Sequence, residues 1–141
     1  MLSNQLSQIP NLESRISDLL SPNLVWNERY RQLLMLGKSL PSIDINLKTE
    51  DQRVQGCESD LWLVTTKQTI EIDSNARIIR GLAVLVLHAI NNCSDLEQAQ
   101  HYFEQSVSQA GLSQHLAQSR SNGITSLWKA IHSAHNANQG G

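Results

Sequence analysis

Cys57 is the side chain whose type and setting best suit covalent chemistry. It follows Gly56 and precedes Glu58-Ser59, just before the apolar run Leu61-Trp62-Leu63-Val64. Glycine lets the backbone turn tightly, even at positive φ, so the segment predicts a thiol on a loop braced by a strand, where reactive residues commonly occur. The thiolate form of cysteine is a nucleophile. The alternative is that Cys57 is a small buried hydrophobe, as free cysteines often are.

Five histidines are possible partners for such a thiol or for a metal. His115 is conceivable as the base of a Cys–His pair with Cys57; the alternative is a loop histidine that hydrogen-bonds the backbone. His132 and His135 are spaced i, i+3, which on a helix can chelate a metal. No third ligand lies nearby in the sequence, and a catalytic zinc needs about three protein ligands, so we predict no metal site. His88, in an apolar segment, is expected to be a hydrogen-bonded core residue.

Arg120 has a charge that local helix stability does not explain. Ser121 or Asn122 is expected to cap the last helix, which places Arg120 at the positive end of the helix dipole, where a cation costs a few tenths of a kcal/mol. One interpretation is an ion pair with Glu58 or Asp60 in the thiol loop. The other is that Arg120 faces the Cys57 loop or a partner protein.

Arg77 and Arg80 show the same mismatch at the start of a predicted buried helix. Either acidic neighbours neutralise them or they line a surface for a partner. Cys93 follows a polar Asn91-Asn92 pair without an adjacent glycine, and we expect no chemical role for it.

Hydrophobic periodicity predicts an α+β fold with a small antiparallel sheet of two or three strands covered by helices. Asp73-Ser74 is expected to cap the apolar helix, and Trp26, Tyr30, Trp62 and Trp128 are expected to be largely structural. We expect helices over residues 11–20, 26–37, 76–90, 95–103 and 122–137, and strands over 61–66, 69–72 and, shorter, 53–55.

Composition indicates one domain, residues 1–141, with loosely attached ends of about ten and five residues. A net charge of −2 without basic runs argues against nucleic-acid binding. The polar first ten residues resemble no secretory signal, and the apolar stretch from Leu82 to Ile90 is too short to cross a bilayer. We therefore expect a cytoplasmic protein that does not bind membranes, with two free thiols. The absence of a Cys-x-x-Cys pair gives no support to a thioredoxin-like or zinc-ribbon site.

Four blocks, over about residues 24 to 135, make the chain similar to the SufE/CsdE family of sulfur acceptor proteins. The first and third blocks look closer to the CsdE branch. The blocks are Trp26-Asn27-Glu28-Arg29-Tyr30-Arg31-Gln32-Leu33 with Leu36-Gly37-Lys38 and Leu40-Pro41; Val54-Gln55-Gly56-Cys57 with Leu61-Trp62-Leu63; Asp73-Ser74 with Arg77-Ile78-Ile79-Arg80-Gly81-Leu82; and Leu116 with Ser119-Arg120-Ser121-Asn122-Gly123.

The resemblance implies that Cys57 accepts sulfur, as a persulfide, from a pyridoxal-phosphate cysteine desulfurase, and that the protein stimulates this partner. Such a carrier is an accessory protein that holds no cofactor of its own. It passes sulfur to an iron–sulfur scaffold complex or another sulfur-using pathway. The family fold is related to that of IscU-type cluster scaffolds, but this chain lacks the three cysteines of a cluster site. Residues expected to support the loop or bind partners are Gly56, Glu58, Arg77, Arg80, His115 and Arg120.

Two other functions are compatible with the sequence. A non-covalent adaptor would activate a desulfurase without carrying sulfur. A Cys–His hydrolase would turn over substrate without any partner, although no oxyanion-hole or base-orienting pattern is visible. Loading with a desulfurase and cysteine distinguishes the carrier, which gains one sulfur atom, from the adaptor, which gains none.

Overall fold

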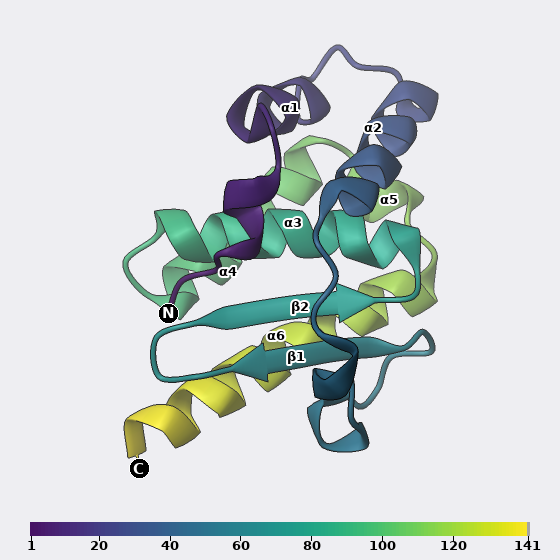
Figure 1. Cartoon of the computed structure of the whole chain (residues 1–141). Helices are drawn as coiled ribbons and strands as arrows, with labels where there is room; N and C mark the ends of the chain where they lie inside the picture. Colours follow the sequence, from purple (N-terminus) through teal and green to yellow (C-terminus); the bar gives the residue numbers. More distant parts are fainter. Residues whose placement is uncertain (141) are drawn as a thin grey trace.

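Helices pack against a two-stranded β-hairpin in this protein (Figure 1). The computed structural model describes the backbone of residues 1–140 and the side chains of residues 1–138. The predicted α+β class is confirmed. In chain order the elements, with η for a 3-10 helix, are η1 (Gln5–Gln8), α1 (Leu12–Leu19), α2 (Trp26–Ser39), η2 (Ile45–Leu47), η3 (Glu50–Gln52), β1 (Leu61–Thr65), β2 (Ile70–Ser74), α3 (Arg77–Asn92), α4 (Leu96–Gln109), α5 (Leu112–His115) and α6 (Gln118–Gly140).

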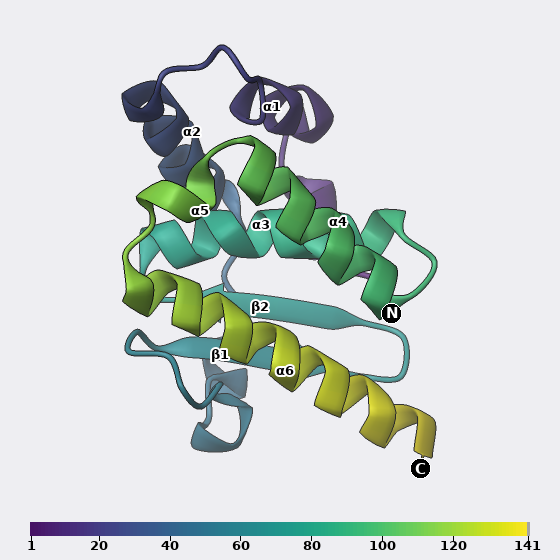
Figure 2. The ribbon, with the colours of Figure 1, turned by 180° about the vertical axis from the view of Figure 1, so that it is seen from behind.

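The hairpin forms where β-branched and apolar residues flank a short polar turn. β1 and β2 pair antiparallel, with Leu63 opposite Ile72. In the turn, Thr66 Oγ1 accepts a hydrogen bond from the backbone N–H of Thr69 at 2.9 Å. This side-chain hydrogen bond stabilises a turn that lacks the glycine common in tight turns. α6 lies across one face of the hairpin (Figure 2), so this face is buried and α6 is placed beside the strands.

Helix α3 is the central buried helix that its apolar sequence predicts. Every residue from Ile78 to Ile90 except Arg80 is buried. α2 crosses α3 closely because glycines meet at the contact: a Cβ added at Gly37 would lie 2.5 Å from the Arg77 carbonyl oxygen and 2.7 Å from the Gly81 nitrogen. This close crossing brings the first turn of α3 against the end of α2.

The predicted cap of α3 by Asp73-Ser74 is wrong, because both residues belong to β2. The N-cap position is Ala76, and its backbone N–H donates to Ser74 Oγ at 3.1 Å. Asp73 is fully buried and forms ion pairs with Arg80 and, at 3.0 Å, with Lys48. A buried carboxylate needs such partners, so Asp73 links the hairpin to α3 and to the loop after α2.

The first ten residues, which we expected to be loosely attached, pack against the hairpin. Leu2 forms an isolated backbone bridge with Thr69. The Gln5 side-chain amide donates to the carbonyl and accepts from the N–H of Ile72, both at 2.8 Å. Leu6 is buried behind it. The polar composition was misleading because a glutamine amide can replace a strand's backbone partner.

Helix α6 is longer than predicted. It begins at Gln118, so Ser121 and Asn122 lie inside its first two turns and the predicted caps are wrong. It continues to Gly140 through the segment that we expected to be loose, and Asn138 Nδ2 donates to the Thr66 carbonyl at 3.0 Å. Gly141, the last residue of that predicted loose end, lies outside the described residues.

The aromatic residues have different environments. Trp128 is 2% exposed, as predicted, whereas Trp26 and Trp62 are half-buried. Tyr30 is 40% exposed, so its burial does not match the largely structural role expected of it. Arg29, one position earlier, is buried instead. Its Nε donates to the Leu19 carbonyl at 2.8 Å, which gives a hydrogen-bond partner to a carbonyl at the C-terminal end of α1.

Candidate functional site

The Cys57 loop, defined as residues 55–60, leads into β1. The predicted strand over 53–55 is reduced to a single bridge between Arg53 and Trp62. The loop turns at Gly56, whose φ of 91° favours glycine, as the sequence predicted. A Cβ at Gly56 would also lie 2.5 Å from Ser126 Oγ on α6. Glycine is therefore required both for the turn and for the close approach to α6.

The Cys57 sulfur lies against a second glycine, in α6. A Cβ added at Gly123 would be 2.8 Å from Cys57 Sγ and 3.7 Å from Ile79 Cδ1. The thiol therefore occupies the space that a side chain at position 123 would fill, next to the apolar end of Ile79. Cys57 is half-buried and packs against the core, so the structure combines the two alternatives left open by the sequence: a loop thiol that is partly buried.

The far end of the loop is anchored by polar contacts. Asp60 Oδ1 lies 3.1 Å from Arg53 Nη2, and its carbonyl accepts from Ser74 Oγ at 2.6 Å. Arg120 Nη1 donates to Ser59 Oγ at 3.1 Å. No ion pair connects Arg120 with Glu58 or Asp60 within the described part of the chain. Arg120 thus faces the thiol loop, which was the second of its two interpretations.

The tip of the loop has no such anchors. Among the described residues, no hydrogen bond involves Gly56, Cys57 or Glu58, and the Glu58 side chain is exposed. Packing against α6 is what keeps the tip in place. A segment with few hydrogen bonds between two anchored ends opens at lower free energy than its surroundings.

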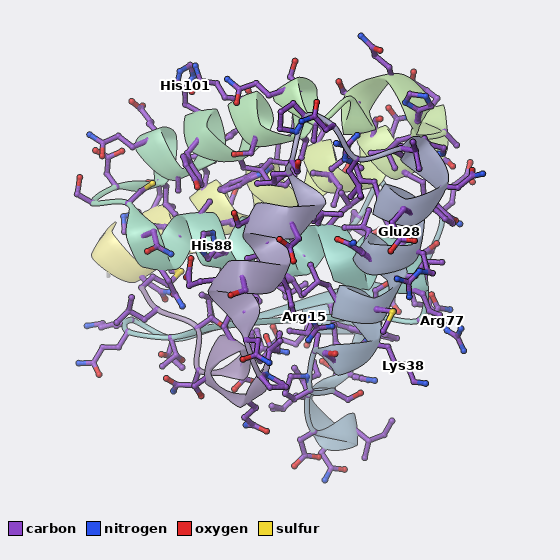
Figure 3. The ribbon with its side chains drawn as sticks, turned by 90° about the horizontal axis from the view of Figure 1, so that it is seen from above. Arg15, Glu28, Lys38, Arg77, His88 and His101 are labelled. Atoms are coloured by element: carbon purple, nitrogen blue, oxygen red, sulfur yellow. The ribbon has the colours of Figure 1, made fainter. Side chains whose placement is uncertain are left out.

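The two arginines at the start of α3 differ. The Arg80 guanidinium contacts Asp73 and the Leu40 carbonyl, and Nε donates to the Gly37 carbonyl at 2.9 Å. These contacts match the structural interpretation of Arg80. Arg77 is exposed and reaches outward at the edge of the molecule (Figure 3). It forms no ion pair with any described residue, which leaves it available to a partner.

His115 does not contact Cys57. Its ring stacks on Trp26 at a centroid distance of 4.3 Å, and Nδ1 hydrogen-bonds the Gly111 carbonyl at 2.9 Å. The loop interpretation of His115 therefore fits the structure, and the Cys–His pair has no geometric support. His88 is 7% exposed and bonds Glu13 at 3.0 Å, which confirms it as a hydrogen-bonded core residue.

The remaining metal and thiol candidates lie elsewhere. His132 Nε2 bonds Gln100 Oε1 at 2.8 Å. Within residues 1–138, no three His, Cys, Asp or Glu side chains are grouped to hold a metal ion. Cys93 is half-buried at the C-cap of α3.

Sequence reasoning missed three residues that shape the thiol site: Ser59, Gly123 and Ser126. Gly123 had a usable signal, because an isolated glycine inside a helical pattern often marks a close packing contact. Ser59 and Ser126 had none, since serines are common on exposed helix and loop surfaces.

The loop, its cysteine and the α6 glycine lie inside a segment that matches a known family. A profile of SufE, described as an Fe-S metabolism associated domain, matches residues 14–135. The chain belongs to the SufE family. The sulfur acceptor protein CsdE of Escherichia coli is 38% identical over 117 residues, 79% of each chain, which confirms the predicted CsdE branch. SufE-like proteins of Rhizobium etli and Rhizobium meliloti, both uncharacterised, are 36% and 34% identical and cover 75% and 77% of this chain, respectively, and 77% and 83% of their own lengths.

In this SufE-family chain, none of the described helices is both long and apolar enough to span a membrane.

Proposed function

We propose that this protein is a sulfur acceptor that takes persulfide sulfur onto Cys57 from a pyridoxal-phosphate cysteine desulfurase. The observation that carries the proposal is the placement of Cys57 Sγ against Gly123, on a loop tip without hydrogen bonds in a SufE-family chain. The printed name of the Escherichia coli relative, a sulfur acceptor protein, supports the same function. In this proposal the protein is a sulfur-transfer accessory protein and has no cofactor of its own.

The transfer is a thiol exchange without net oxidation. The Cys57 thiolate attacks the outer sulfur of the desulfurase persulfide. A bond forms between Cys57 Sγ and that sulfur, the sulfur–sulfur bond of the donor breaks, and its electron pair leaves on the donor cysteine as a thiolate. Repeating the exchange with a downstream thiol delivers the sulfur to an iron–sulfur scaffold complex or another sulfur-using pathway.

The two states of the loop serve the two stages of this cycle. In the tucked state, Cys57 Sγ lies against Gly123 and the side chain packs partly against the core, where we expect a persulfide to be shielded from reductants and oxidants. To reach a partner's active site the tip must swing out. The positive φ at Gly56 and the unanchored tip allow this motion, while the Arg120–Ser59 and Asp60–Arg53 contacts hold the loop's end.

The desulfurase is expected to dock over the loop. Glu58 and Arg77 are exposed, and Arg120 is half-buried beside the loop. All three can therefore reach charged groups of a docked partner at the rim of the interface. Charged rim contacts mainly set encounter rate and register. Stimulation of the desulfurase follows if the docked loop removes sulfur from its cysteine faster than free thiols do.

Intact-mass spectrometry tests the proposal. The protein is incubated with a purified cysteine desulfurase and cysteine, without added reductant. The parent chain and Cys93→Ser should each gain one sulfur atom, whereas Cys57→Ser, nearly isosteric but a poor nucleophile, should gain none. A loaded Cys57→Ser variant together with an unloaded Cys93→Ser variant would move the acceptor site to Cys93.

A non-covalent adaptor remains the second candidate, because the tucked thiol would look the same in a protein that never accepts sulfur. For an adaptor, Cys57→Ser would stimulate the desulfurase as well as the parent chain does, and no mass increase would occur on either. A Cys–His hydrolase is not proposed, since His115 is engaged by Trp26 and Gly111.

A further inference from the structure

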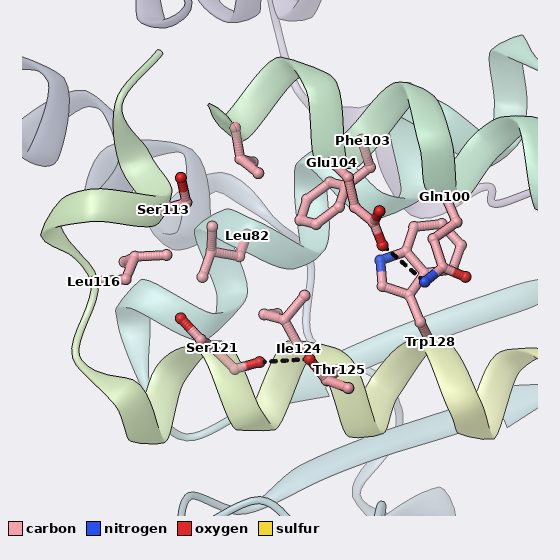
Figure 4. A pocket seen from close by; sticks show the side chains of 11 residues that line it. Leu82, Gln100, Phe103, Glu104, Ser113, Leu116, Ser121, Ile124, Thr125 and Trp128 are labelled. Carbon is pink, nitrogen blue, oxygen red and sulfur yellow. Dashed lines mark hydrogen bonds between the residues drawn. The ribbon is translucent and has the colours of Figure 1, made fainter. Parts of the chain in front are cut away.

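On the side of α6 away from the thiol loop, a cavity of about 260 Å³ lies between α3, α4, α5 and α6 (Figure 4). Its wall is mostly apolar, with Leu82, Phe103 and Ile124 among the lining side chains, and Ser113 and Thr125 adding hydroxyl groups. Cavities smaller than this are large enough for a benzene-sized molecule. The residues that bring α6 to Cys57 play no part in this lining.

The cavity contains a buried hydrogen-bond donor without a partner. Trp128 is 2% exposed, and its indole Nε1 forms no hydrogen bond with any described residue. Figure 4 shows the nitrogen on the edge of the ring that faces the cavity. A buried donor left unpaired is costly, so native structures satisfy nearly all of them. This donor therefore calls for an acceptor inside the cavity.

The neighbouring polar groups are already engaged with each other. Gln100 Nε2 donates to Glu104 Oε1 at 2.9 Å, and Gln100 Oε1 bonds His132 Nε2 at 2.8 Å. The amide of Gln100 is thus occupied at both ends, and the Glu104 carboxylate is held at the same side of the cavity (Figure 4). Glu104 is exposed, so its carboxylate lies at the solvent-facing rim of the cavity, where it disfavours a second anion.

From this geometry we propose that the cavity binds a small neutral molecule with an apolar, preferably aromatic, body and one oxygen acceptor, such as a carbonyl, that takes the Trp128 N–H. The apolar wall selects the body, the unpartnered indole selects the acceptor, and Glu104 at the exposed rim disfavours anions. The binding goes beyond the proposed sulfur acceptance and does not require Cys57, so failure of either proposal leaves the other standing.

Three probes of nearly equal shape test this chemistry: acetophenone, α-methylstyrene, which replaces the carbonyl by a CH₂ group, and benzoate, which adds a charge. Two-dimensional NMR of the full chain follows the three tryptophan indole N–H signals, and Trp128→Phe identifies the signal of Trp128. Acetophenone should shift that signal saturably. α-Methylstyrene should bind about fivefold more weakly, the factor of one neutral hydrogen bond, and benzoate should also bind more weakly than acetophenone.

Variants separate the cavity from nonspecific binding. Val107→Phe fills the lining and should abolish acetophenone binding, whereas Gln105→Phe adds the same ring to the exposed face of α4 and should not. If the spectrum of Val107→Phe shows that it is unfolded, Ser113→Leu, on the far side of the cavity from Trp128, replaces it. Trp128→Phe lacks the indole signal, so its binding is followed by the backbone amide signals of the lining residues, and it should bind acetophenone and α-methylstyrene equally.

Three results would overturn the proposal. The first is the absence of a saturable shift of the Trp128 indole, which would identify a cavity that holds water only. The second is acetophenone binding that survives both filling variants. The third is benzoate binding as tight as acetophenone binding, which would show that Glu104 does not select the ligand.

Discussion

Replacing Gly123 by alanine should release the Cys57 thiol from its resting place. The added Cβ would lie 2.8 Å from Cys57 Sγ, whereas nonbonded heavy atoms favour separations of about 3.5–4.0 Å. The sulfur must therefore move by roughly 1 Å or leave. Overpacking of this kind costs about 1–3 kcal/mol, and the tucked state bears this cost while the exposed state does not.

That cost shifts the loop equilibrium more than it changes global stability. A difference of 1–3 kcal/mol between the two states raises the exposed population roughly 5- to 150-fold. In contrast, alanine is favoured over glycine within a helix by about 1 kcal/mol. This gain offsets part of the clash, so the melting temperature should fall only slightly.

The assay is the rate at which a chromogenic disulfide reagent modifies Cys57. It is measured in a Cys93→Ser background, so that the colour change comes from Cys57 alone. Gly123→Ala should react at least about fivefold faster than its parent, the lower limit set by the clash. Asn122→Ala is the control, because it improves helix propensity on an exposed face beside the glycine without approaching Cys57. An unchanged or slower rate for Gly123→Ala would refute the tucked position of the sulfur.

Three further predictions concern the charges and the core. Arg120→Ala should weaken desulfurase binding, measured by calorimetry, and slow sulfur loading, with a loss of stability below about 1 kcal/mol. The control Ser59→Ala removes only the intramolecular hydrogen bond and should retain more binding. Normal loading with a clear drop in melting temperature would make Arg120 a purely structural residue. Trp128→Ala should cost about 3–5 kcal/mol by denaturant unfolding while Tyr30→Ala costs less than about 1 kcal/mol; equal losses would contradict their burial. Arg80→Leu should cost about 3–5 kcal/mol, because it leaves its aspartate partner buried with one cation fewer; a loss below 1 kcal/mol would show that Lys48 suffices.

Much of the local structure followed from the sequence. The apolar run from Leu82 to Ile90 predicted a buried helix, and the alternation around Ile70 and Ile72 predicted a strand. The structure has both, as α3 and β2. Gly56 before Cys57 indicated a tight turn, and the turn has the positive φ that glycine favours. The sequence also carried the family blocks, which the SufE match confirms.

Element ends and partners were decided by the tertiary structure. Asp73 looked like a helix cap but is a buried strand residue, because Arg80 and Lys48, far from it in helix and loop, converge on its carboxylate. Gln5 lies in a polar N-terminal segment that looked loosely attached, yet its amide completes the backbone pairing of β2. Such contacts depend on side chains that meet only once the chain has folded.

The thiol site divides in the same way. The sequence by itself indicated the candidate nucleophile, its loop and the arginine worth testing, since residue type and neighbours decide those. Only the fold decided that α6 lies over the hairpin, which brings Gly123 to the Cys57 sulfur and Arg120 to Ser59 across more than 60 residues of chain. Whether the sulfur is covered at rest is therefore a property of packing between distant elements, which no local pattern encodes.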